Sequence, residues 1–129
     1  MKIKPYWDYL KYLLNHKKNV FIECWNEGLY LHAFTHDLSK FLPCEFIPYA
    51  RYFYIDKEKY EDDFEKAWIH HYRYNKHHWN YWGYCWVNTR DFNFRIKMDN
   101  PAEMKDKYIR QMICDWKAMS RKFGNIVQN

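Results

Sequence analysis

Residues that break regular structure are scarce in this sequence, because its 129 residues contain only three glycines and four prolines. Both residue types end helices and form turns, so their scarcity favours long segments over a sheet with many turns. A chain of this length can bury enough surface for one core and is seldom divided into two. We therefore predict a single, mainly α-helical domain over residues 1–129, a compact bundle of about five to six helices.

Helix-end signals divide the chain into predicted segments. The segments carry apolar residues at three- and four-residue intervals, between prolines or capping side chains and a closing glycine or proline. The last segment has the clearest start, because Asn100 can be the N-cap, Pro101 takes the first helical position and Glu103 completes a capping box. The predicted helices span residues 5–26, 29–42, 48–55, 56–79 and 100–123.

One stretch follows a different period. Phe92, Phe94, Ile96 and Met98 alternate with polar residues, which is the two-residue repeat of a half-buried strand. A short apolar run and a polar turn precede this stretch, so we predict a small β-hairpin near residues 84–98.

The net charge and the cysteines indicate the kind of ligand and the cellular compartment to expect. The net charge of +5 fits an anionic ligand such as a nucleotide, and it equally fits nucleic acid. Cys24, Cys44, Cys85 and Cys114 form no C-x-x-C pair, which is typical of reduced thiols. No apolar run follows the N-terminal residues, so we expect no signal peptide. No stretch approaches the roughly 20 apolar residues of a membrane span. We expect a cytoplasmic protein with no membrane partner.

Two ionisable residues lie on apolar faces of predicted helices. His16 follows Leu13 by three residues and precedes Val20 by four, and Asp115 lies at helical spacing from Met112 and Met119. A carboxylate on an apolar stripe is costly unless it is paired or coordinated. A core histidine and a salt-bridged aspartate are the structural alternatives to metal ligands.

His36 and Asp37 complete an ordered set. Neutral imidazole and carboxylate both bind ions such as Zn, Mn or Fe, so an adjacent pair can share one metal. With a histidine on an earlier helix and an aspartate on a later one, the order along the chain is H, then HD, then D.

That order resembles the HD superfamily of metal-dependent phosphohydrolases. The resemblance implies an HD-like helical bundle in which His16, His36, Asp37 and Asp115 bind a metal ion. The stretch 36–40 further resembles the HD-x-x-K motif of the HD-GYP branch, which implies that Lys40 neutralises substrate phosphate.

A histidine-rich stretch separates the HD pair from Asp115. His70 and His77 are two helical turns apart, as are His71 and His78, so each pair can share a helix face. The HD-GYP branch holds a second metal with histidines in this interval, and the likeness implies that role for His71, His77 and His78, with His70 outside the ligand set. The GYP signature itself is missing, since Trp79 and the residues after it stand in its place.

A broader likeness covers nearly the whole chain. The strings HDLSKF at 36–41, EFIPYARYF at 45–53, NKHHW at 75–79 and MICDW at 112–116 resemble a family of small bacterial and phage proteins of unknown function. This likeness supports the same boundaries and the same site, and it implies no activity.

The function that these residues favour is metal-dependent hydrolysis of a phosphorylated small molecule, such as a nucleotide. One or two divalent ions, of Mn, Fe, Zn, Ni, Co or Mg, would activate water. Asp37 and Lys40 are the candidate catalytic residues. Lys40, Arg51 and Arg73 are candidate phosphate ligands, with surface solvation as the alternative for the two arginines. Glu45 could orient a metal ligand or accept a proton, or it could simply stabilise the first turn of a helix.

Two other functions remain open from the sequence. Aromatic and basic residues interleave over 68–86, as in a module that stacks the bases of single-stranded nucleic acid. The chain could also be an interaction protein that metal stabilises without turnover, such as a phage-encoded inhibitor of a host system.

Overall fold

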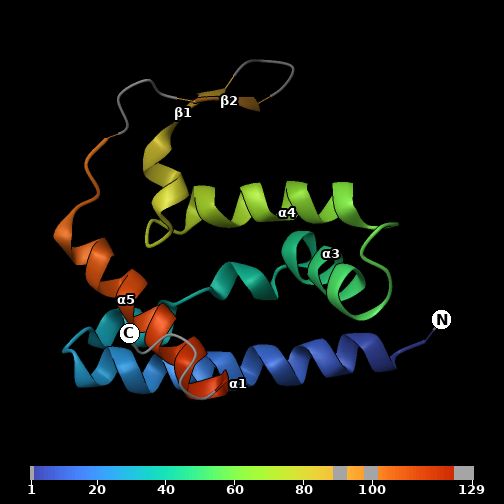
Figure 1. The fold of residues 1–129 in the computed structure, drawn as a ribbon, viewed down its shortest axis with the longest axis horizontal. Coiled ribbons are helices and arrows are strands. Elements are labelled where there is room, and N and C mark those ends of the chain that lie inside the picture. The colour runs from blue at the N-terminus through green and yellow to red at the C-terminus, as the bar shows by residue number, and fades with distance from the viewer. Residues whose placement is uncertain (1, 89–92, 98–101, 124–129) are drawn as a thin grey trace.

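The computed structural model describes residues 2–88, 93–97 and 102–123. The described chain is mainly α-helical, with two short 3₁₀ helices and one β-hairpin (Figure 1). The predicted fold class, a helical bundle with a small hairpin, is confirmed. In chain order the elements are α1 (Lys4–Asn26), α2 (Tyr30–Thr35), η1 (Leu38–Phe41), α3 (Pro43–Tyr54), α4 (Glu61–Tyr74), η2 (Trp79–Gly83), β1 (Tyr84–Asn88), β2 (Asn93–Lys97) and α5 (Asp106–Phe123).

The long helix α1 forms the base of the bundle and contacts both halves of it. As predicted, it has a proline in its first turn, and Gly28 follows its end with a φ of 76°, a conformation that glycine adopts freely. In Figure 1, α5 crosses one end of α1, while α3 and α4 lie above the other end. The described helices include none with the length and apolar character needed to cross a bilayer.

Two separate apolar clusters hold the helices together. One joins the first half of α1 to α3 and α4, and the other joins its second half to α2 and α5. Burial of a side chain such as Leu13 or Val20 contributes about 1.5–3 kcal/mol. Between these two residues, on the same face of α1, lie the buried polar side chains of His16 and Asn19. The first cluster contains Tyr9, Leu13, Tyr49, Ala50 and Ala67. The second cluster contains Val20, Cys24, Ala33, Cys114 and Ala118.

The predicted helix over 29–42 is wrong in its middle. Helix α2 ends at Thr35, and Asp37 then adopts a left-handed conformation with a φ of 54° before η1 begins. This conformation costs a residue other than glycine of order 1–3 kcal/mol, so the surrounding contacts must stabilise it. The Lys17 ammonium donates to the carbonyls of Phe34, at 2.8 Å, and His36, at 2.5 Å, and so satisfies acceptors that the interrupted helix leaves open.

Helix α3 begins five residues before the predicted start. Pro43 occupies the first turn, where its missing N–H group costs nothing, and Pro48 lies inside the helix. The earlier start places Glu45 in the first turn of α3.

Helix α4 is shorter than predicted at both ends. The Asp56 carboxylate accepts the backbone N–H groups of Glu58, at 3.0 Å, and Lys59, at 3.2 Å, and so forms a local turn before the helix. At the other end Asn75 is extended, and its side-chain amide donates to the carbonyl of His71 at 2.7 Å. Residues 77 and 78 therefore lie beyond the helix, contrary to the prediction.

The hairpin is confirmed, while the start of the last helix is not. Tyr84 pairs with Lys97 and Asn88 with Asn93, although Phe92 and Met98 fall outside the described residues. Asn100 and Pro101 also lie outside them, and helix α5 begins at Asp106. The chain before α5 is held by another contact, because the Ala102 N–H donates to the Trp82 carbonyl at 3.0 Å.

Candidate metal centre

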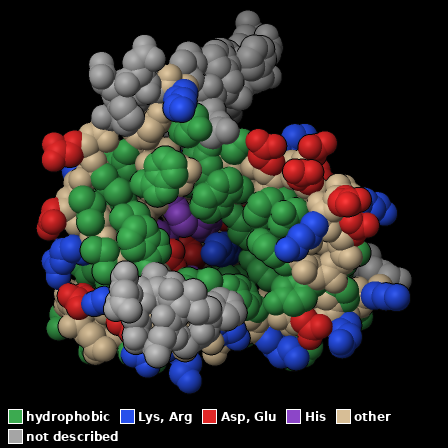
Figure 2. All heavy atoms as spheres, viewed as in Figure 1, with side chains coloured by type: hydrophobic (Ala, Val, Ile, Leu, Met, Phe, Trp, Pro, Cys, Tyr) green, Lys and Arg blue, Asp and Glu red, His purple; other side chains and the backbone are tan. Residues whose placement is uncertain are grey.

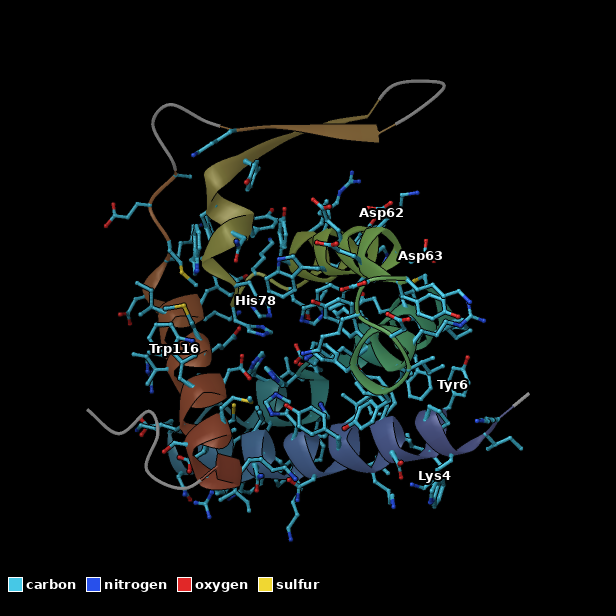
Figure 3. All side chains as sticks on the ribbon, turned by 45° about the vertical axis from the view of Figure 1, so that its right-hand side comes forward. Lys4, Tyr6, Asp62, Asp63, His78 and Trp116 are labelled. Carbon is cyan, nitrogen blue, oxygen red and sulfur yellow. The ribbon has the colours of Figure 1, made fainter. Side chains whose placement is uncertain are left out.

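All seven histidines of the chain gather with two aspartates and a glutamate in the region between α1 and α4. Figure 3 shows His78 among the nitrogen- and oxygen-bearing side chains there. Three groups of these residues offer ligand atoms that lie within 4.8 Å of one another and could hold a metal ion. The groups are His16, His36, Asp37 and Asp115; Asp37, His71, His77 and His78; and His32, His36 and His77.

The first group joins three parts of the chain that are distant in sequence. His16 Nε2 of α1 lies 3.0 Å from Asp115 Oδ1 of α5. His36 Nε2 lies 3.0 Å from Asp37 Oδ2 and 3.5 Å from Asp115 Oδ1. These are the four residues that the resemblance to HD phosphohydrolases singles out, and the fold brings them together.

The second group lies on the other oxygen of the same aspartate. Asp37 Oδ1 is 3.3 Å from His71 Nε2 and 3.2 Å from His77 Nε2. His71 Nε2 is in turn 3.0 Å from His78 Nε2. The three histidines thus meet as predicted, but the reason differs, because His77 and His78 reach the group from the loop after α4.

Asp37 therefore faces two groups with one carboxylate. Its left-handed backbone turns the side chain inward, where it is almost wholly buried. Burial alone would raise the pKa of this carboxyl, but His36 and Lys40 beside it hold the pKa well below its usual range. The carboxylate is charged and can bind one cation through each oxygen.

The donor atoms themselves fit a metal. Among the described residues, His36 Nε2, His77 Nε2 and both Asp37 carboxylate oxygens are buried and lie in ion pairs, but none of the four makes a hydrogen bond of good geometry. Such atoms are costly to bury, since almost all buried polar groups in proteins are satisfied. Imidazole nitrogens and carboxylate oxygens are the usual ligands of Zn, Mn, Fe and related ions, so a bound cation would satisfy all four atoms.

Glu45 orients one of the ligands from outside. It is fully buried, and it accepts a hydrogen bond from His71 Nδ1 at 2.7 Å and another from His70 Nδ1 at 2.6 Å. Burial would raise the pKa of Glu45, but these hydrogen bonds bring it below its usual value. A carboxylate that holds Nδ1–H leaves Nε2 free for a metal, which is a common arrangement around bound ions. His70, half-buried, contacts Glu45 and belongs to none of the three groups.

His32 is a member of the cluster that the sequence analysis missed. Its Nε2 lies 2.9 Å from His36 Nδ1, and burial, reinforced by His36 itself, lowers the pKa of His32 to about 3. A neutral His32 can accept the Nδ1–H of His36 and leave His36 Nε2 directed at Asp37. The available signal was its spacing, because His32 precedes His36 by one helical turn.

Of the predicted phosphate ligands, only Lys40 lies at the centre. Its ammonium is 3.2 Å from Asp37 Oδ2, and although burial would lower the pKa of Lys40, Asp37 raises it above its usual value. Arg51 instead donates to the Tyr6 hydroxyl at 3.0 Å, and the Arg73 guanidinium lies over the Tyr74 ring at 5.8 Å. Both arginines are absent from the described lining of the cavity beside Lys40.

That cavity opens onto the first group. It has a volume of about 590 Å³, within the range of small-molecule sites, and its lining includes His16, Lys40 and Asp115. Figure 2 shows a hollow whose rim is hydrophobic and whose floor displays histidine, acidic and basic side chains. A second cavity, of about 540 Å³, is lined by His32 and His77 together with residues such as Lys76 and Lys107.

The fold and this site define a helical protein with buried histidine–aspartate groups that could hold a metal ion. Comparison with protein families assigns the chain more closely. Residues 5–129 match the Family of unknown function (DUF5662), and the chain belongs to that family. The expected membership of a family of unknown function is thus confirmed, whereas no HD-domain family matches. No curated protein and no solved structure matches the chain.

Proposed function

We propose that this protein is a metal-dependent phosphohydrolase that acts on a nucleotide or another phosphoester in the cytoplasm. One observation carries the proposal: the two oxygens of Asp37 face two groups of histidines, and the half-buried Lys40 lies beside them at the floor of a cavity. His16, His36, Asp37 and Asp115 would hold one divalent ion, and Asp37, His71, His77 and His78 a second.

Divalent ions bound at these groups would supply Lewis acidity and lower the pKa of a water molecule. The ligand set is rich in imidazole, which favours Mn, Fe, Co, Ni or Zn over Mg, an ion that prefers oxygen ligands. The affinity of the centre then depends on neutral imidazoles, whose orientation Glu45 and His32 maintain through the Nδ1 atoms of His71 and His36.

Lys40 gives the centre its preference for phosphate. In the protein alone its ammonium pairs with Asp37 and faces the cavity. A phosphate oxygen that enters the cavity would pair with this ammonium. The ammonium would then neutralise the negative charge that develops on the phosphoryl group. Aromatic side chains such as Tyr49 and Phe64 line the same cavity, and they would exclude water around the phosphate and so strengthen its interaction with Lys40.

The test pairs metal analysis with one variant and a matched control. The purified protein is analysed by inductively coupled plasma mass spectrometry, and a panel of phosphoesters is then screened with the metal found. Lys40→Gln should keep the metal and lose hydrolysis by at least about 10²-fold, while Lys66→Gln, at an exposed position of α4, should behave as wild type. Circular dichroism verifies that both variants fold.

The other outcomes assign other functions. A protein that holds no metal, and whose folding ignores chelators and added metal, would sink the proposal. Metal without hydrolysis of any phosphoester would indicate an interaction protein stabilised by metal. Salt-sensitive binding of single-stranded nucleic acid that persists in chelator would indicate a nucleic-acid module.

A further inference from the structure

The cavity at the first ligand group has an unusual lining. We infer that its ligand is a phosphomonoester that carries one phosphate and one planar aromatic group, as a nucleoside monophosphate does. The inference rests on the proposed function and narrows its substrate class. It follows from the contrast between the floor of the cavity, which is charged, and its wall, which is aromatic.

The wall of the cavity is mostly aromatic. Seven of the eleven lining residues are Tyr, Phe or Trp, and they come mainly from α1, α3 and α4. Several of these rings pack edge-on or tilted, such as Tyr49 against Phe64 at 5.1 Å between ring centroids. At the rim, Phe53 is 50% exposed and Tyr54 39% exposed. Exposed aromatic faces beside a charged site are the surface on which a base can stack.

The floor of the cavity offers enough positive charge for one phosphate group. Lys40 is the one Lys or Arg among the described residues that line the cavity, and Asp115 lies on the same lining. Lys40 and the metal ions can neutralise a single phosphate group. A further phosphate of a polyphosphate would lie along the aromatic wall, beyond Lys40 and the metal ions, where a charge without a partner is costly. The Lys57 ammonium lies over the Phe53 ring at 5.8 Å but is outside the described lining.

Tyr49 links the aromatic wall to the charged floor of the cavity. Its hydroxyl is buried and has no hydrogen-bond partner among the described residues. Its ring lies 5.9 Å from the Lys40 ammonium, so the residue stands between the charged floor and the aromatic rim.

The experiment compares three phosphoesters on the metal-loaded protein. Adenosine 5′-monophosphate carries a base and one phosphate, ribose 5-phosphate lacks the base, and adenosine 5′-triphosphate carries two more phosphates. We expect kcat/KM for the monophosphate to exceed that for ribose 5-phosphate by roughly tenfold or more, because base–aromatic stacking contributes at that level. The triphosphate should be the poorer nucleotide.

Two matched substitutions assign the effect to the wall. Phe53→Leu removes a half-exposed ring from the rim and should raise KM for adenosine 5′-monophosphate several-fold while leaving ribose 5-phosphate unchanged. Phe34→Leu makes the same change at a residue that is 59% exposed on α2 and lies outside the lining, and it should alter neither substrate.

The results separate the inference from the proposed function. Metal-dependent hydrolysis that treats ribose 5-phosphate as well as the nucleotide, or prefers the triphosphate, overturns the inference and keeps the function. If no phosphoester is cleaved, the function fails, and equilibrium binding decides the ligand class. The inference is supported if adenosine 5′-monophosphate binds saturably and more tightly than ribose 5-phosphate, and if Phe53→Leu weakens this binding. Absence of such binding overturns it.

Discussion

The two ligand groups that share Asp37 are assembled in different ways. The residues of the first group come from α1, from α5 and from the turn that follows α2, so this group depends on the packing of helices that are far apart in sequence. The second takes its three histidines from the short segment 71–78 at the end of α4. The first group should therefore connect metal binding to the stability of the bundle, and the second should respond mainly to local changes.

Asp37 belongs to both ligand groups, so a substitution at this residue should have the largest effect on metal binding. Asp37→Asn keeps the size of the side chain but removes the charge that both groups use, so we expect both metal equivalents to be lost. Hydrolysis should fall by at least about 10²–10³-fold, as when a central electrostatic group is removed. Metal analysis and phosphate release measure the two effects.

The control for this change is Asp62→Asn, an exposed aspartate in the first turn of α4. It should keep both equivalents. Retention of full metal content and activity by Asp37→Asn would contradict a shared carboxylate.

Single ligands of each group should separate the two equivalents. Asp115→Asn is expected to remove the first metal and His78→Gln the second, each leaving the other in place. Since a bound metal stabilises the folded state, by about 2.7 kcal/mol at 100 times the Kd, chelator lowers the melting temperature. The decrease in melting temperature that chelator causes should be smaller in Asp115→Asn than in His78→Gln. The reason is that, of the two groups, only the first joins α5 to α1. Thermal unfolding with and without chelator provides the measurement, and equal responses of the two variants would refute the difference.

The outer histidine and glutamate should act on one group each. Glu45 contacts His71, and His32 contacts His36. Loss of such an orienting partner typically weakens metal binding about 10–100-fold. Glu45→Gln should therefore weaken the second equivalent, and His32→Gln the first. Competition with a chromophoric chelator resolves the two affinities, and an effect of both variants on the same equivalent would argue against this assignment.

Arg51 provides the smallest expected effect. It was a candidate phosphate ligand, but its side chain donates to the Tyr6 hydroxyl and lies over the Tyr60 ring, away from both groups. Arg51→Gln should change kcat/KM less than about twofold, because this charge lies outside the described lining of the cavity. A tenfold loss in steady-state kinetics would show that Arg51 reaches the substrate.

Much of the site could be predicted because its residues carry local signals. His16 and Asp115 stand out as ionisable side chains on apolar helix faces, and the pair at 36–37 stands out by its adjacency. The departures follow from interactions that periodicity does not contain. Continuous helices were predicted through Asp37 and through His77, whereas the structure has a left-handed turn at one and a loop at the other.

Helical content and the hairpin thus follow from the sequence, since spacing, capping and alternation act between near neighbours. The candidate ligands were singled out by the resemblance to HD phosphohydrolases, and not by these local patterns alone. Tertiary structure alone shows that one carboxylate faces two histidine groups, that His32 contacts His36, and that Lys40, but not Arg51, lies beside them. The physical reason is that a positive φ at Asp37 is unfavourable by itself. It is held by contacts between distant elements, such as those of Lys17 on α1 with the carbonyls of residues 34 and 36.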